Sequence, residues 1–397
     1  MTRAAGAFPT PVERRPRLWN DVRARGLLAQ LLFAAIVLVL GVVAVLDLRA
    51  NMAARGVPTD FAFLGQPAGF DVNQTLIAYG AGSTYGRAFL VGLLNTLLAS
   101  AVGLVLATVL GFFIGFARLS DNWIVARGAL AYVELARNTP LLLQLLFWYN
   151  AVLKPLPSPR ESLALPFGAF LNNRGLFAPA PVFEPGAGLV GAACVLALAL
   201  FFALRAVPPR RLAAPWRMAA HGAACAFALV LPLAAFVAAD APVGFDRPRL
   251  VGFNFAGGMR LTPEFVALTL GLGLYTAAFI AEVVRAGIEA VPRGQREAAE
   301  ALGLTHAQAR RLVVMPQATQ LIVPLLTNQY LNLIKNSSLA VFIGYPDLVQ
   351  VFAGTALNQT GAAVQIIFMT MAVYLAISLL ASLAMNLYGR RHAPRER

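Results

Sequence analysis

The chain has 397 residues, of which 59% are hydrophobic and only 13% are charged. Because soluble domains carry about 25% charged residues, this composition excludes an ordinary soluble protein and favours a membrane protein. The 32 basic residues outnumber the 18 acidic residues and give a net charge of +14. The cytoplasmic loops of membrane proteins also collect lysine and arginine, so the basic excess predicts no nucleic-acid partner.

Two kinds of functional site are excluded by residue type. The two lysines, Lys154 and Lys335, follow leucine and isoleucine, so the chain has no Gly-Lys-Ser/Thr loop to bind the phosphates of ATP. The three histidines and two cysteines are scattered along the sequence. We therefore predict neither a metal site nor a cofactor.

Apolar stretches recur along the chain at lengths that suit membrane-spanning helices. Crossing about 30 Å of hydrocarbon takes about 20 residues of helix. Seven stretches are free of charged residues, at 26–46, 88–117, 186–204, 218–239, 265–281, 317–334 and 361–388. An eighth, residues 128–153, is partly masked by Glu134, Arg137 and Pro140. The predicted fold class is an all-α integral membrane protein with about eight transmembrane helices.

The charge distribution predicts how the chain is oriented in the membrane. With a cytoplasmic N-terminus, 21 basic residues fall on the inside, 10 on the outside, and Arg137 within a span, as expected for short cytoplasmic loops. We expect a basic cytoplasmic N-terminus (1–25), a retained anchor (26–46), a periplasmic loop (47–87), a main membrane domain (88–388) and a cytoplasmic tail (389–397). The anchor is longer than the core of about 7–15 residues in a signal peptide. The outside segments, including residues 154–185, show no sustained period and are expected to be loops.

The cytoplasmic segment 285–316 predicts a helix-turn-helix outside the membrane. Alanine, glutamate and leucine favour a helix over residues 295–302, and Gly303 can adopt the left-handed conformation that ends it. Thr305 and Gln308 then form a capping box that opens a second helix.

The first of these helices presents a small apolar knob. Ala298, Ala301 and Leu302 share one face, flanked by Glu297 and Glu300. The knob either inserts into a groove of a partner protein or packs against other cytoplasmic loops of the same chain.

The same segment resembles the EAA loop of permease subunits of ATP-binding-cassette (ABC) importers. Glu297-Ala298-Ala299, then Gly303, then the Val313–Pro316 run match that motif at its spacing, with Val313 and Met315 replacing the usual Ile and Leu. The resemblance implies that a separate ATPase, expected as a dimer, docks on this loop. It assigns the coupling role to Glu297, Ala298, Ala299, Ala301, Leu302, Gly303 and Pro316.

Further segments resemble the polar amino acid branch of these permeases, the histidine and glutamine type. They are residues 134–144, 275–295 and 333–339. The resemblance implies a five-helix permease core in the bacterial inner membrane, an external amino-acid-binding protein, and no enzymatic activity in this chain. The N-terminal anchor and an insertion at 155–260 with two further spans resemble the larger permease of general L-amino-acid importers. That subtype implies a second, different permease chain.

Ionisable residues near the predicted inner surface are candidates for a gate. Glu134 and Arg137 are three residues apart, as are Glu282 and Arg285, so each pair can meet on one helical face. The pairs are either structural ion pairs at helix ends or parts of a gate that rearranges when the loop moves. If Glu282 or Glu134 instead carries protons, the chain is a secondary transporter, which leaves the helix-turn-helix unexplained. A membrane hydrolase is a further alternative, but the histidines lie far from any Ser or Asp constellation.

A polar stripe marks a candidate translocation path. Asn328, Asn332 and Lys335 share one face of the seventh span, where they would be unfavourable against lipid. They either hydrogen-bond between helices or face the path of a zwitterionic amino acid, with Lys335 attracting its carboxylate. Gln144, Asn95 and Thr96 are weaker candidates for this path.

Overall fold

The computed structural model describes residues 22–54, 60–206, 214–240 and 243–392. Residues 1–21 and 393–397, predicted as parts of the cytoplasmic N-terminus and tail, lie outside the described residues. The α-helices are α1 (Val22–Ala54), α2 (Tyr85–Arg118), α3 (Trp123–Asn138), α4 (Leu141–Leu146), α5 (Ala187–Ala206), α6 (Ala214–Ala238), α7 (Pro263–Glu289), α8 (Arg293–Ala301), α9 (His306–Ala309), α10 (Met315–Asn336), α11 (Leu357–Thr360) and α12 (Ala363–His392).

Short 3-10 and π segments connect several of these helices. The 3-10 segments are η1 (Ala62–Gly65), η3 (Pro159–Glu161), η4 (Pro166–Gly168) and η7 (Ser337–Ile343), and the π segments are η2 (Phe147–Leu153), η6 (Arg310–Val314) and η8 (Val349–Ala356). Each of the eight apolar stretches falls in a helix apart from one or two end residues, and the eighth is divided among α3, α4 and η2. The predicted helical membrane fold is confirmed.

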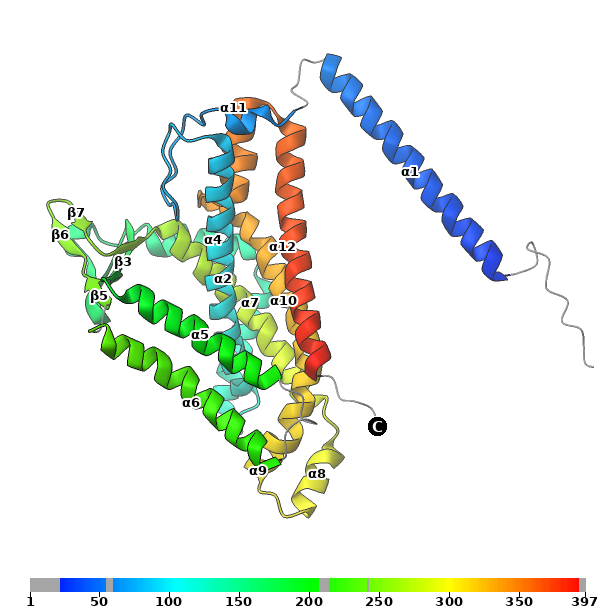
Figure 1. Ribbon diagram of the computed structural model, residues 1–397, viewed down its shortest axis with the longest axis vertical. Coiled ribbons are helices and arrows are strands. Elements are labelled where there is room, and N and C mark those ends of the chain that lie inside the picture. The colour runs from blue at the N-terminus through cyan, green and yellow to red at the C-terminus, as the bar shows by residue number, and fades with distance from the viewer. Residues whose placement is uncertain (1–21, 55–59, 207–213, 241–242, 393–397) are drawn as a thin grey trace, which may run out of the picture.

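The described helices differ in how well they suit a membrane by length and composition. Four are long and apolar enough to cross it: Arg25–Ala54, α2, α7 and Ala363–Leu387. The shorter apolar helices cover Leu141–Leu153, Ala187–Phe201 and Ala226–Ala238. In Figure 1, α1 stands apart from the other helices, and none of its apolar window is buried.

The core is built around α2 and α7, which pack closely along most of their length. A Cβ atom at Gly111 would lie 2.6 Å from the Cβ of Ile280, and one at Gly115 would lie 2.8 Å from the Cβ of Val284. Only glycine leaves room for the facing helix at these two positions, which allows α2 and α7 to approach closely. α10 packs against α7, and α12 packs against α10 (Figure 1).

The insertion contains strands that the sequence analysis did not predict. A four-stranded antiparallel sheet has the order β1 (Leu163–Leu165), β2 (Ala169–Asn172), β3 (Gly175–Ala178) and β8 (Met259–Leu261). β4 (Ala180–Phe183) pairs with β5 (Val243–Asp246), and β6 (Arg249–Val251) with β7 (Asn254–Ala256). Residues 154–185, expected to be a loop, thus hold four strands. Runs of three or four residues are too short to show a period in sequence.

Candidate functional site

The loop between α7 and α10 folds as the helix-turn-helix that the sequence predicts. α8 ends at Ala301, and Gly303 has a φ of +81°, the left-handed conformation that glycine adopts most easily. Thr305 caps α9, and the reciprocal hydrogen bonds with Gln308 complete the capping box. His306 Nδ1 lies 3.1 Å from a Glu300 carboxylate oxygen, which ties the two helices together across the turn.

The apolar knob on α8 is not covered by the described part of the chain. Ala298, Ala301 and Leu302 are exposed, and Leu302 has 83% of its surface accessible. Ala299 faces the other way and is buried. Packing of the knob against other described loops of this chain is therefore contradicted, and the knob is free to contact another protein. Glu297 is exposed, and Pro316 lies in the first turn of α10.

The C-terminal ends of α2 and α7 are joined by an ion network. Glu282 pairs with both Arg118 and Arg285, and Arg285 also pairs with Glu289. The predicted pair Glu282 and Arg285 is thus formed and extended by two residues. Arg118 could not be predicted from the sequence, because no local spacing brings α2 to α7. The i, i+4 spacing of Arg285 and Glu289 within α7 is a signal that could have found Glu289.

The second predicted pair does not form. Glu134 accepts a hydrogen bond from Asn138 at 3.2 Å, and the guanidinium of Arg137 lies 5.3 Å from the ring centre of Phe279. Both Glu134 and Arg137 are exposed, so solvent screening leaves little to gain from pairing them. The i, i+3 spacing allowed the contact, but Arg137 contacts the aromatic ring instead.

The eighth apolar stretch, residues 128–153, is broken between α3 and α4 at Thr139 and Pro140. Thr139 has extended backbone, and Pro140 cannot donate the hydrogen bond that would continue α3. The amide of Gln144 donates to the carbonyls of Ala136 and Thr139 at 2.9 and 3.0 Å. Gln144, a candidate for the path, thus uses its donor to satisfy the carbonyls that the break leaves free.

The polar stripe on α10 lies on an open face of the chain. Asn328, Asn332 and Lys335 are exposed, whereas Leu326 and Leu333 are buried on the opposite face. Among the ion pairs of the described residues, Lys335 has no carboxylate partner. Exposing polar side chains to lipid hydrocarbon has an unfavourable free energy. This face of α10 is therefore expected to contact water or another protein.

Asn95 and Thr96 hold a loop instead of facing a path. Asn95 donates to the carbonyl of Pro346 at 2.9 Å, and Thr96 accepts from the amide of Leu348 at 2.9 Å. Between them Asp347 is fully buried and accepts from the amide of Gln350 at 2.8 Å. Burial raises the pKa of Asp347 to about 7.

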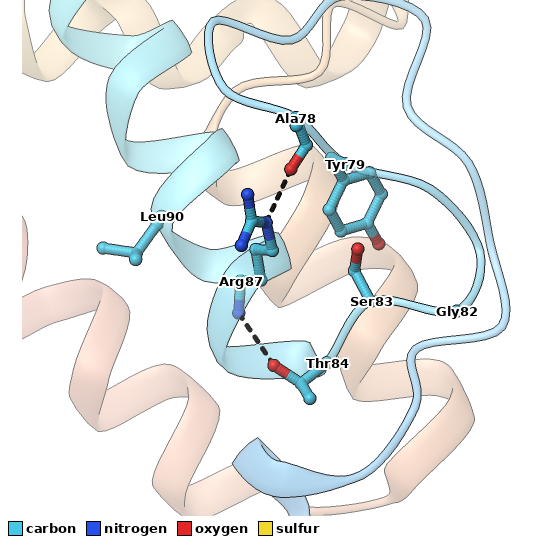
Figure 2. Close-up of a pocket in the computed structure, with 7 residues that line it drawn as sticks. All are labelled: Ala78, Tyr79, Gly82, Ser83, Thr84, Arg87 and Leu90. Carbon is cyan, nitrogen blue, oxygen red and sulfur yellow. Dashed lines mark hydrogen bonds between the residues drawn. The ribbon is translucent and has the colours of Figure 1, made fainter.

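Arg87 fixes the N-terminal end of α2. Its Nε donates to the carbonyl of Ala78 at 2.6 Å, and its amide donates to Thr84 at 3.3 Å, as Figure 2 shows. The residues joined by these hydrogen bonds line an open hollow of about 790 Å³. The bonds hold the loop before α2 against the first turn of the helix.

The matched family is described as the binding-protein-dependent transport system inner membrane component, over residues 107–396. The chain belongs to this family. A putative amino-acid ABC transporter permease of Escherichia coli (YhdX) is 51% identical, covering 91% of this chain and 93% of the relative. The general L-amino acid permease AapQ of Rhizobium johnstonii is 49% identical, with 87% of each chain covered. A crystal structure of an amino acid ABC transporter with histidines has 24% identity and a TM-score of 0.47, and covers 77% of this chain and 95% of its own.

The resemblance to ABC importer permeases is therefore confirmed. The chain is a multi-pass protein of the inner membrane, as its family and its apolar helices indicate.

Proposed function

We propose that this chain is the larger permease subunit of an ATP-driven importer for polar or general L-amino acids. Two relatives, each with at least 87% of both chains covered, are named as amino-acid permeases, which supports the substrate class. The observation that carries the coupling mechanism is the exposed knob of α8, where Leu302 is 83% exposed on a loop that matches the EAA motif.

In this proposal ATP is hydrolysed by a separate cytoplasmic subunit docked on α8. Exposed Ala298, Ala301 and Leu302 supply the apolar contact, while the capped turn at Gly303 fixes how α8 is presented. The ATP-bound and ATP-free partner favour different positions of the loop, and this shifts the population between outward-open and inward-open states. The network of Arg118, Glu282 and Arg285 lies at the end of α7 that leads into the loop, and this position supports the proposal that it rearranges as a gate.

The open face of α10 supports a path shared with a second permease chain. Asn328, Asn332 and Lys335 offer amide groups and a cation to a zwitterion, and a second subunit on this face would shield them from lipid. The substrate arrives on an external amino-acid-binding protein, and both termini of this chain are cytoplasmic.

The test is uptake by the complex purified through this subunit and reconstituted in vesicles with a purified amino-acid-binding protein. We expect uptake of L-amino acids when ATP is enclosed on the cytoplasmic side and all ion gradients are collapsed. If uptake instead requires an ion gradient and is the same with and without ATP, the protein is a secondary transporter. Mass spectrometry of the same complex identifies the second permease chain and the ATPase.

A further inference from the structure

A cavity lies beside the break between α3 and α4. It has a volume of about 480 Å³ and is lined by α3, α4, η2 and α7. Sites for small molecules span about 300–1,000 Å³, so the cavity can hold a sizeable group. It lies away from the polar stripe of α10, none of whose residues line it.

The polar side chains of its wall are largely satisfied within the chain. The hydroxyl of Tyr132 donates to the carbonyl of Leu274 at 2.5 Å, and that of Thr139 donates to the carbonyl of Leu135 at 2.8 Å. The side-chain nitrogen of Gln144 donates hydrogen bonds to the carbonyls of Ala136 and Thr139, which the helix break leaves without backbone partners. The rest of the wall is aliphatic or aromatic.

This wall is unsuited to an amino acid. The Trp148 N–H and the Gln144 side-chain oxygen offer one further donor and one acceptor. A zwitterion needs donors for two carboxylate oxygens and acceptors for three ammonium protons, and burying it without them is costly. The chemistry of the wall selects a hydrocarbon.

The cavity also lies at the depth of the bilayer hydrocarbon. Leu274 is 11 residues after the start of α7 and 15 before its end, which places it about 16 and 22 Å from the two ends at 1.5 Å per residue. The hydrocarbon core is about 30 Å thick. Three residues of the wall are well exposed: Leu135 by 71%, Leu143 by 56% and Phe147 by 56%. The cavity therefore opens on the lateral surface of the helices.

We propose that this cavity binds one acyl chain of a membrane phospholipid. Acyl chains surround the opening at this depth. If the cavity were empty, the side chains of its wall would lose van der Waals contacts on that side. The bound chain fills the space that the helix break creates beside Gln144. The proposal depends on the position of the cavity in the membrane and is independent of which substrate is transported.

The test uses Trp148 as a reporter in the purified complex. The other three tryptophans of this chain are replaced by Trp19→Phe, Trp123→Phe and Trp216→Phe, and the tryptophans of the partner subunits are likewise replaced by phenylalanine. The complex is reconstituted in phosphatidylcholine with acyl chains brominated near the middle. Bromine quenches indole fluorescence at short range. Leu274→Phe is added to fill the cavity, and Leu270→Phe, one turn earlier on α7, half-exposed and not in the wall, is the matched control.

We expect strong quenching of Trp148, reduced about twofold by Leu274→Phe because contact is short-ranged, and unchanged by Leu270→Phe. Leu143→Phe on α4 gives the same reduction, and replaces Leu274→Phe if that variant fails to assemble.

Equal quenching in all variants would overturn the proposal, because lipid would then touch only the rim. Relief of quenching by saturating L-amino acid would assign the cavity to the substrate. Quenching in the isolated subunit but not in the complex would assign it to a side chain of a partner subunit.

Discussion

Gly115 lies where the backbone of α2 meets α7. A Cβ atom there would lie 2.8 Å from the Cβ of Val284 and 3.0 Å from the carbonyl oxygen of Ala281. We expect Gly115→Ala to lower the thermal midpoint of the purified protein, with a cost of about 1–3 kcal/mol for overpacking. Gly128→Ala in α3 is the control, since nothing lies within 4 Å of its added Cβ. Equal midpoints for the two variants would show that α2 can shift without cost.

Asp347 makes stability depend on pH. Its pKa in the folded protein is about 7, well above the ordinary value, because burial disfavours the carboxylate. The folded state therefore holds a proton that the unfolded state has lost, and stability falls by about 1.4 kcal/mol per pH unit between about pH 4 and pH 7. We expect Asp347→Asn to remove this slope in unfolding measurements from pH 5 to pH 8. The exposed Asp246→Asn should keep the wild-type slope.

Lys335 tests the proposed path. It is exposed on the open face of α10 without a carboxylate partner among the described ion pairs. We expect Lys335→Ala to lower uptake in vesicles while the complex assembles normally, because a cation kept at that position attracts the substrate carboxylate. Lys335→Arg should retain more uptake. Normal uptake by Lys335→Ala would show that the ammonium group of Lys335 extends to the outer membrane interface and does not contact the substrate.

Single residues with a chemical signature were predictable from sequence, and those that depend on tertiary partners were not. Gly303 and the Thr305 cap follow from local chain geometry, and both are confirmed. Asn95 and Thr96 looked like path residues because they are polar within a span. They bind a loop about 250 residues away, a contact that no local pattern encodes.

At the scale of elements, α8 is the proposed contact between permease and ATPase. We expect Ala298→Asp to place a charge in the partner's groove at a cost of about 1–3 kcal/mol, which weakens association about tenfold to a hundredfold. The measurement is recovery of the ATPase with the purified subunit. Ala307→Asp, the same exposed change on α9, should leave recovery unchanged. Normal recovery with Ala298→Asp would remove α8 from the interface.

Elements were predictable where a long uniform pattern defines them. The apolar stretches fall almost entirely within helices, because a long uniform apolar run favours a helix of the length that crosses a membrane. The sheet of the insertion was not predictable, since β3 pairs with β8 across both helices of the α5 and α6 hairpin. Such pairing depends on contacts distant in sequence and on strands too short to show alternation.

For the whole molecule, the remaining prediction is orientation in the membrane. The basic residues divide 21 to 10 between the two sides when the N-terminus is cytoplasmic, and this bias sets the topology of short loops. A reporter active only in the cytoplasm should therefore work when fused after Arg397. It should fail when inserted at Gly252, in the turn between β6 and β7, where a φ of +62° and open space around the residue suit an insertion. A reporter active only in the periplasm should give the reverse pattern at both sites and controls for expression. Cytoplasmic activity at Gly252 would place the strands of the insertion inside the cell, and α5 and α6 could then not cross the membrane as proposed.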